Sequence, residues 1–302
     1  MRGKMTARII GVFIALLMAL PAQATSVMTS IKPLQLIAAG LVTQDDTVDV
    51  LLPPGASPHS YALKPSDIRG LNQADVTVWV GPELELFLSK LLADKPSVLT
   101  LTQVENMPLR HFDGGHHHHH GHDHGEHNID PHLWLGPKTT RVAAQAITDA
   151  LIEAAPDKAE QYQANLTRFN EQLDQTVADI QQDLASRIQS GYFVFHDAYG
   201  YFEDAFGLEK TGHFTVDPSQ KPGAKTLVTI RRGLLNHDAT CIFTEPQFNP
   251  ALIDAVTRHN DVNVLALDPL ATSIPVAPDS YQVFLKDLGN RFTRCLKHET
   301  TD

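Results

Sequence analysis

The sequence has few cysteines, no excess of positive charge and, beyond its first 24 residues, no long apolar run. Two cysteines among 302 residues are too few for a scaffold held together by disulfides. A formal net charge of −11 argues against nucleic acid and anionic lipid as partners, and it is compatible with attracting cations. The HExxH motif of zinc proteases and the nucleophile elbow of α/β-hydrolases are also absent, so neither kind of enzyme is indicated.

The first 24 residues have the pattern of a secretory signal peptide. Arg2, Lys4 and Arg8 precede the apolar run IIGVFIALLMAL, and the small-residue pattern AQA ends at Ala24. The apolar run is too short to span a bilayer as a helix. We therefore expect cleavage after Ala24, export, no direct membrane insertion and a monomeric mature chain. Loss of the three basic residues takes the formal charge from −11 to −14.

Cys241 and Cys295 are the two cysteines, and both lie in the second half of the chain. In an oxidising compartment a lone pair most often forms a disulfide, which for a loop of this length stabilises the fold by about 4 kcal/mol in the chain-entropy estimate. A pair of thiolate metal ligands is the alternative, but it needs further ligands close by. Cys241 lies in an apolar run and Cys295 in a helical pattern, which favours the disulfide.

Residues 25–156 alternate strand-like and helix-like segments. The predicted strands are VMTSI, VDVLL, VTVWVG and SVLTLTQV, and the predicted helices are PLQLIAAGLV, residues 65–72, ELFLSKLL and a helix from Lys138. Continuous apolar strands that alternate with helices indicate a parallel sheet covered on both faces. We therefore predict an N-terminal α/β lobe.

Residues 157–190 form the longest periodic segment, with apolar residues every three or four positions until Gly191. A helix of this length would reach about 50 Å at 1.5 Å per residue, which is longer than a small domain is wide. It could join two lobes as a rigid strut. A coiled-coil partner is the alternative reading of the same pattern.

Residues 191–302 restart the alternation. The predicted strands are GYFVFH, EKTGHFTV, TCIFTEP and VNVLALD, and the predicted helices cover about 198–206, 224–237, 250–259 and 279–296. Each side of the long helix thus has four strand–helix units. The predicted fold is α/β, with two (β/α)4 lobes joined by one long helix.

A histidine tract separates the last strand of the first lobe from its last helix. Nine histidines lie in it: His111, His116, His117, His118, His119, His120, His122, His124 and His127. Imidazole prefers zinc, copper and nickel, so this density predicts metal binding. An expression tag is one alternative, although tags usually sit at a terminus, and a functionless polar loop is another. Four glycines and the lack of apolar residues predict a disordered loop over 111–128.

Four polar residues outside the tract stand where ligands of α/β proteins bind, at the carboxyl ends of strands or just after them. His59 follows VDVLL, His196 ends GYFVFH, Asp268 ends VNVLALD, and His132 follows the tract in the turn DPH. A single histidine in such a place is more often structural. Three histidines and a carboxylate at matching places suit tetrahedral zinc in a cleft between the lobes. An open fourth position would also suit hydrolytic zinc.

The motifs together resemble a known family. GASPHSYALKPSD, a histidine-rich insert before DPHLWLGP, the long helix, FVFHDAYGYF, FTEPQFNP and LALDPL are similar to those of the ZnuA family of cluster A-I (cluster 9) metal-binding proteins. The resemblance covers nearly the whole mature chain. It implies a periplasmic zinc-binding protein that serves an ABC importer, zinc ligation by His59, His132 and His196, and a disulfide between Cys241 and Cys295.

The fourth ligand is less determined. Manganese-binding relatives have glutamate where this chain has His196, so histidine there favours zinc, and an aspartate matching Asp268 completes their shell. Several ZnuA proteins carry a glutamate before the first ligand histidine, but here that residue is Pro58. We expect Asp268 or, second, water; Glu83 is a remote candidate.

The expected function is therefore that of a carrier and not an enzyme. It captures Zn²⁺ tightly and delivers it to a membrane permease, while the tract binds additional zinc more weakly. A zinc-dependent hydrolase and a periplasmic zinc store or adhesin are the alternatives. Because zinc needs neutral imidazoles, we expect affinity to fall as the pH falls through about 6.5.

Overall fold

The computed structural model describes residues 24–112, 128–185, 191–218, 220–246, 251–258 and 262–296. Residues 1–23 of the predicted signal peptide and the histidines from His116 to His127 lie outside these ranges. So do residues 186–190, the predicted end of the long helix.

The N-terminal lobe is built on a parallel sheet of four strands in the order β2-β1-β3-β4. Its strands are β1 (Ser26–Thr29), β2 (Thr47–Val50), β3 (Val76–Trp79) and β4 (Val98–Thr100). Its helices are α1 (Lys32–Ala39), α2 (Pro65–Gln73), α3 (Ser89–Leu92) and α4 (Pro137–Ala154), with short 3-10 turns at Leu86–Leu88, Leu101–Gln103 and Leu133–Leu135. The β3 strand is buried along its whole length, as its continuous apolar pattern predicts.

The C-terminal lobe repeats this design, with the strand order β6-β5-β7-β8. Its strands are β5 (Tyr192–His196), β6 (Gly212–Thr215), β7 (Cys241–Thr244) and β8 (Asn263–Ala266). Its helices are α6 (Gly200–Phe206), α7 (Ala224–Leu235), α8 (Ala251–Thr257) and α9 (Ser280–Leu296). In both sheets the second strand of the lobe lies at one edge, beside the first. The predicted architecture of two (β/α)4 lobes is confirmed.

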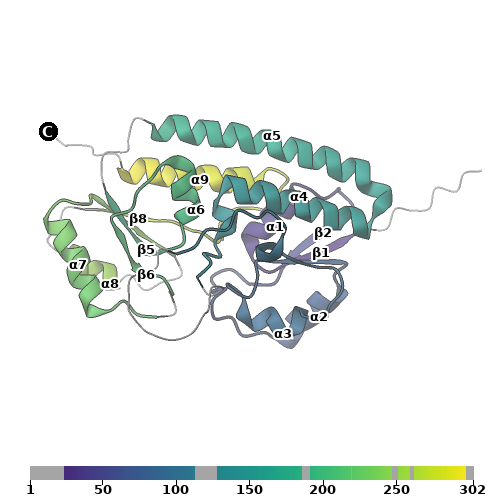
Figure 1. Ribbon diagram of the computed structural model, residues 1–302, viewed down its shortest axis with the longest axis horizontal. Helices are drawn as coiled ribbons and strands as arrows, with labels where there is room; N and C mark the ends of the chain where they lie inside the picture. Colours follow the sequence, from purple (N-terminus) through teal and green to yellow (C-terminus); the bar gives the residue numbers. More distant parts are fainter. Residues whose placement is uncertain are drawn as a thin grey trace, which may run out of the picture.

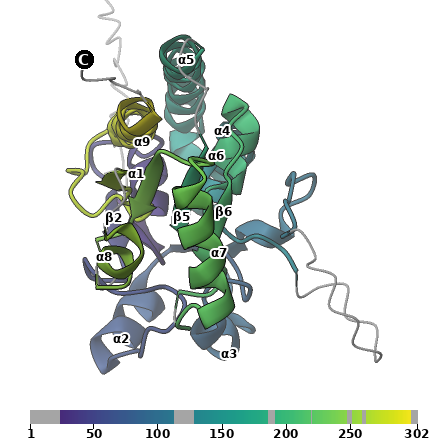
Figure 2. The same ribbon diagram turned by 90° about the vertical axis from the view of Figure 1, so that its left-hand side faces the viewer.

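Helix α5 (Ala159–Leu184) runs along both lobes (Figure 1). Its 26 residues span about 39 Å at 1.5 Å per residue. The apolar residues that the periodicity singles out are buried against α4 and α9, which lie beneath α5 in the end-on view (Figure 2). Helices of the same chain therefore cover this face, and the pattern needs no coiled-coil partner. A short 3-10 turn, Pro156–Lys158, precedes α5, so the helix starts two residues later than predicted.

One prediction is wrong at an edge strand. The segment SVLTLTQV was predicted as a single strand, but only Val98–Thr100 is a strand, and Leu101–Gln103 forms a 3-10 turn. The reason is the length of the neighbouring strand. β4 pairs only with β3, and the last pair is Trp79 with Thr100. Beyond this pair β3 ends, and the chain turns into the 3-10 segment, in which the Thr102 amide donates to the Val80 carbonyl at 2.9 Å.

A single large apolar core extends through both lobes. It contains residues of β1 and β3, of β5 and β7, and of the helices α1, α4, α5 and α9. A smaller cluster under α7 and α8 lies only in the C-terminal lobe. The predicted disulfide is confirmed: it joins Cys241 of β7 to Cys295 of α9, residues 54 apart in the sequence. Within the described residues, no helix has both the length and the apolar character needed to cross a bilayer.

Candidate metal centre

Three histidines from distant parts of the chain meet between the lobes. His59 lies in the loop after β2, His132 just before the Leu133–Leu135 turn, and His196 is the last residue of β5. Their ring centroids are 5.6 Å apart for His59 and His132, 5.3 Å for His59 and His196, and 4.8 Å for His132 and His196. One nitrogen of each ring lies within 4.8 Å of the other two. The sequence predicted these three residues as ligands, and the fold places them together.

Hydrogen bonds between the lobes hold the turn that carries His132. Trp134, two residues on, donates its indole N–H to the Pro269 carbonyl at 2.8 Å. Tyr281 of α9 donates its hydroxyl to the Trp134 carbonyl, also at 2.8 Å. The Trp134 ring packs edge-on against the His132 ring with centroids 5.4 Å apart. Both neighbours lie in the C-terminal lobe, so the turn is fixed relative to the lobe that carries His196.

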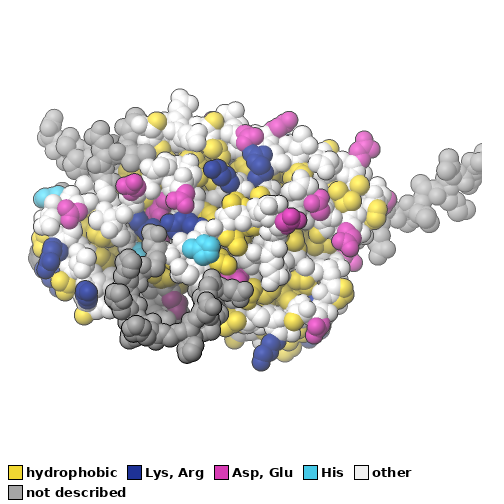
Figure 3. All heavy atoms as spheres, in the orientation of Figure 1, with side chains coloured by type: hydrophobic (Ala, Val, Ile, Leu, Met, Phe, Trp, Pro, Cys, Tyr) yellow, Lys and Arg dark blue, Asp and Glu magenta, His cyan; other side chains and the backbone are white. Residues whose placement is uncertain are grey.

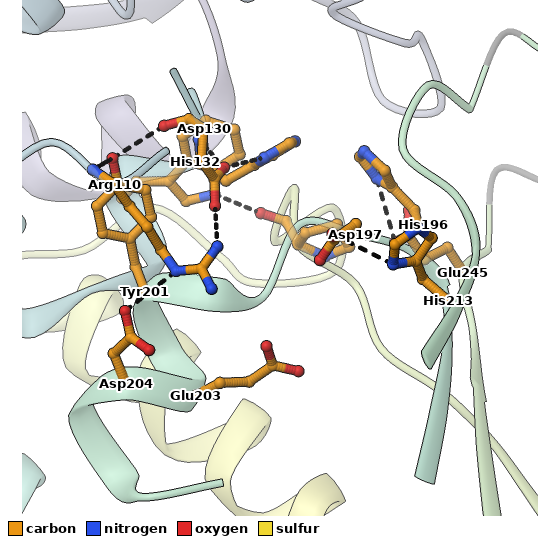
Figure 4. Close-up of polar contacts among 12 residues, drawn as sticks. Arg110, Asp130, His132, His196, Asp197, Tyr201, Glu203, Asp204, His213 and Glu245 are labelled. Carbon is orange, nitrogen blue, oxygen red and sulfur yellow. Dashed lines mark hydrogen bonds and ion pairs between the residues drawn. The ribbon is translucent and has the colours of Figure 1, made fainter. Parts of the chain in front are cut away.

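Asp130 orients the His132 ring (Figure 4). Its Oδ1 atom lies 2.7 Å from His132 Nδ1 and accepts the His132 backbone N–H at 3.1 Å. An accepting carboxylate keeps the proton on Nδ1 and leaves Nε2 as the metal-binding atom. His132 Nε2 is buried and has no hydrogen-bond partner, as expected of an atom reserved for a ligand outside the chain.

Glu245 stands in the corresponding place beside His196. Its Oε1 atom is 3.5 Å from His196 Nδ1 and accepts a hydrogen bond from the Tyr199 hydroxyl at 3.1 Å. The Nε2 atom of His196 is likewise buried without a hydrogen-bond partner. A carboxylate on the Nδ1 side therefore accompanies one histidine of the group from each lobe.

Burial favours the neutral form of His59 and His132. The pKa of His59 is lowered to about 3, first by burial and then by the neighbouring His132 and His196. Burial likewise lowers the pKa of His132 well below its usual value, with His196 as the next cause. Burial raises the pKa of Asp130 to about 7, against the opposing effects of the His132 amide and Arg110. Neutral imidazole is the form that binds a metal, so the site is prepared for a cation and not for protons.

Asp268 lies outside this close group of nitrogen atoms. Its Oδ1 atom accepts the Leu270 amide at 3.1 Å, and its Oδ2 atom accepts the amide and hydroxyl of Thr272 at 2.7 and 2.5 Å. The carboxylate thus caps its own turn. Glu83, the remote candidate, is also outside the group, and its Oε2 atom accepts the Thr102 hydroxyl at 3.0 Å.

Glu245 is the residue that the sequence reasoning missed. It lines the small cavity at the three histidines, together with Trp134 and Pro269. The signal was present, because Glu245 directly follows the last residue of β7. The rule that singled out His196 and Asp268 at the carboxyl ends of their strands applies equally to TCIFTEP.

The histidine tract is described only at its base. His111 forms an isolated antiparallel bridge with Ile129, and the Phe112 amide donates to the Asn128 carbonyl at 2.9 Å. His111 is exposed and is not part of the close histidine group. The two ends of the tract are therefore paired directly next to Asp130 and His132. The predicted disorder of residues 113–127 lies outside the described residues.

The donor set favours one class of metal. Three imidazole nitrogens are typical of zinc, whose sites are tetrahedral with nitrogen ligands at about 2.0–2.1 Å. Basic side chains on the face shown in Figure 3 stand in small groups, while acidic side chains are spread along its edges. That distribution gives this face no continuous basic stripe for nucleic acid.

Known proteins are similar to this chain over nearly its full length. Residues 27–295 match the family model described as the periplasmic zinc-uptake complex component A, ZnuA. The high-affinity zinc uptake system protein ZnuA of Yersinia pestis is 45% identical, over 94% of this chain and 95% of its own. The protein of the same name from Haemophilus ducreyi is 39% identical, over 89% of this chain and 93% of its own.

Solved structures agree in fold. A crystal structure of ZnuA superposes with a TM-score of 0.77 at 25% identity and covers 91% of this chain and 100% of its own. A ZnuA deletion mutant with zinc bound gives a TM-score of 0.77 at 26% identity, over 92% of this chain and all of its own.

Removal of any one of the three histidines should abolish tight zinc binding. We expect His59→Ala, His132→Ala and His196→Ala each to weaken zinc affinity by at least about 100-fold, since each removes one of three nitrogen ligands. Titration in competition with a chelating dye measures the effect. Asp268→Asn, tested in the same titration, should weaken binding if this carboxylate completes the shell. His237→Gln, at an exposed histidine outside the group, is the control; three unchanged histidine variants would refute the site.

Zinc binding should also survive mild acid. Three histidines that titrate near 6.5 would together lose about 1000-fold in affinity between pH 7 and 5.5. Because the pKa of His59 is about 3 and that of His132 is also lowered, we expect a loss of no more than about tenfold. This revises the expectation from sequence. A dye competition repeated at each pH measures it, and a loss near 1000-fold would contradict the burial effect.

The same lowered pKa values should make the folding stability of the metal-free protein depend on pH. Its unfolded state takes up protons at His59 and His132 below pH 6.5, whereas the folded state does not until the pH is much lower. These two imidazoles should therefore lower the free energy of unfolding by up to about 1.4 kcal/mol per pH unit each as the pH drops from 6.5 toward 3. Asp130 and Glu85, whose pKa values burial raises to about 7, oppose them down to about pH 4, because their folded forms take up protons that the unfolded forms do not. Thermal melts of the apo protein provide this control.

Proposed function

The chain belongs to the ZnuA family of periplasmic zinc-uptake components, and we propose that it captures Zn²⁺ between its lobes and delivers it to the permease of an ABC importer. The observation that carries this proposal is the cluster of His59, His132 and His196. Two of these residues have buried Nε2 atoms without a protein partner, and each of the two has a carboxylate near its Nδ1 atom. Such a site is ready for a soft or borderline cation.

The proposed zinc shell consists of His59, His132, His196 and Asp268. Its three nitrogens already lie close together, whereas Asp268 lies outside their group and must move closer to join them. A water molecule as the fourth ligand requires no such rearrangement. Zinc sites accept either an oxygen from the protein or a water molecule.

We propose that the chain is exported and cleaved after Ala24. The described fold supports this boundary, because Ala24 is exposed whereas the next residue, Thr25, is buried. The Thr25 amide donates to Asp46 Oδ1 at 2.9 Å, and its hydroxyl lies 3.2 Å from that of Tyr162. The mature chain would thus begin at its first fixed residue and act as a periplasmic monomer that docks on its permease.

A hydrolase is not favoured by the geometry. A hydrolytic zinc site needs a base beside the metal-bound water. Asp130 instead contacts the Nδ1 atom of His132, and Glu245 lies on the Nδ1 side of His196. These carboxylates orient ligands. A carrier also accounts for the family's zinc-uptake relatives, which a hydrolase would not.

The carrier role can be tested by transport. A Gram-negative host that lacks its own periplasmic zinc-uptake protein should grow in chelator-treated medium when it receives this chain and the matching permease. His132→Ala should fail to restore growth although the protein is exported at the same level. Failure of the wild-type chain, with zinc bound tightly in vitro and both proteins present, would instead favour a zinc store.

The histidine tract is proposed to bind additional zinc more weakly than the cleft. Deletion of residues 113–127 tests this with little disturbance, because Phe112 and Asn128 are already hydrogen-bonded and an Asn-Gly turn can join them. We expect calorimetry to lose the weak sites and to keep one tight site within about threefold of the wild-type affinity. Loss of the tight site would contradict the proposed division of labour.

A further inference from the structure

Arg110 occupies a junction between the two lobes that the zinc site itself does not explain. Its backbone lies at the base of the histidine tract, and its carbonyl accepts the Asp130 amide at 2.8 Å. Its guanidinium reaches across to α6 of the C-terminal lobe (Figure 4). There it lies against Gly200, where an added Cβ atom would stand 2.4 Å from the nearer guanidinium nitrogen. Only glycine at position 200 leaves room for this side chain.

The guanidinium connects two carboxylates from different lobes. Its Nε atom donates to Asp204 Oδ2 of α6 at 3.0 Å. Its Nη1 atom lies 3.6 Å from Oδ2 of Asp130, an oxygen that is buried and has no hydrogen-bond partner. A buried carboxylate oxygen without a hydrogen bond depends on a nearby charge for compensation. Arg110 supplies a charge at that place.

Tyr201 forms a second connection beside the first. Its hydroxyl accepts the Arg110 backbone N–H at 2.8 Å and donates to the Asp130 carbonyl at 2.9 Å. Tyr201 follows Gly200 at the start of α6. The backbone on both sides of the tract is therefore attached to the same turn of α6. We name Arg110, Asp130, Tyr201 and Asp204 the interlobe clasp.

The interlobe clasp is connected to a proposed zinc ligand on each side. At one end, Asp130 holds the Nδ1 atom of His132 at 2.7 Å. At the other, α6 begins four residues after His196. The rings of these two histidines are the closest pair in the site, with centroids 4.8 Å apart. A change at Arg110 would therefore reach one ligand through its carboxylate and the other through the start of α6.

We infer that Arg110 is a positioning residue that fixes the separation of His132 and His196, and hence the fit of the cleft to zinc. The inference rests on the proposed function of this cleft. If Arg110 only stabilised the fold, its replacement would change stability and leave zinc affinity unchanged. The side chain of Asp204 is 67% exposed, and ion pairs of that kind contribute little to stability. Their loss alone would leave zinc affinity unchanged.

Gly200→Ala is the sharpest test, because it keeps every charge and forces the guanidinium to move. We expect about a tenfold loss of zinc affinity, in line with other residues that orient metal ligands. The absorption spectrum of the Co²⁺-substituted site should shift, because it reports ligand geometry. The melting temperature of the apo protein should fall, because the buried Asp130 oxygen loses its compensating charge, so zinc affinity is compared at a temperature well below both melting transitions.

Charge-removing variants complete the test. Arg110→Gln should match or exceed the loss in Gly200→Ala, and Arg110→Lys should recover part of it. Asp204→Asn should give a smaller loss, and the double variant with Arg110→Gln should be no worse than Arg110→Gln alone. Arg291→Gln is the matched control. Arg291 is also partly exposed, but it pairs with a carboxylate of its own helix α9, that of Asp287 at 2.7 Å. It should bind zinc like the wild type.

The results of these experiments distinguish failure of the inference about Arg110 from failure of the proposed zinc-carrier function. Wild-type affinity and an unchanged Co²⁺ spectrum in both Gly200→Ala and Arg110→Gln would overturn the clasp and leave the zinc carrier intact. Absence of tight zinc binding in the wild-type chain would overturn the proposed function itself. If Arg110→Gln fails to fold, Gly200→Ala still decides, because it adds only a methyl group.

Discussion

The structure depends on holding three histidine rings close together, two of which have a buried Nε2 atom without a hydrogen-bond partner in the described part of the chain. A buried nitrogen without a hydrogen bond costs about 1–3 kcal/mol. Two such atoms are described, on His132 and His196, whose ring centroids lie 4.8 Å apart. Other interactions in the protein must offset this cost. They must also prevent the rings from rotating to form hydrogen bonds with nearby protein groups. Asp130 does so for His132, since its short contact with Nδ1 fixes the ring and its proton.

A rigid scaffold is the second requirement, because the ligands come from two lobes. The continuous core under α5 and α9 supplies it, with Phe169 of α5 packed against Tyr281 of α9. Polar contacts then fix the lobes at the site. Trp134 donates to Pro269, and Tyr281 donates to the Trp134 carbonyl. Apolar burial thus sets the overall position of the lobes, while directional hydrogen bonds set the ligands within it.

Much of this could be predicted from the sequence, since the fold and the three histidines follow from local patterns. Apolar runs of strand length and a helical period of three to four residues act over short distances. The rule that ligands gather at strand ends then brought His59 and His196 to one place. What failed depended on contacts between distant segments. The predicted strand SVLTLTQV is cut short at Thr100, where its pairing with Trp79 of β3 ends.

The roles of Asp130 and Glu245 were hidden for the same reason, because each depends on which ring nitrogen it faces. No sequence pattern states that Glu245 Oε1 lies 3.5 Å from His196 Nδ1, or that Arg110 faces a buried oxygen of Asp130. Glu245 could have been found as a strand-end carboxylate, but its function as a neighbour of a ligand could not. Such residues become visible only when the fold fixes side-chain directions.

The three ligands are held unequally, and this bears on how a rigid cleft can both capture and release a cation. His132 is tied through Asp130, and His196 ends a fully buried strand. His59, by contrast, lies in the segment 51–64, which has no helix or strand, and it is the least buried of the three. A core that continues through both lobes resists a hinge movement, because opening would expose apolar surface along α5 and α9. A change in coordination that leaves the core intact is therefore easiest at His59. In such a change, the distance between the rings of His132 and His196 would stay the same.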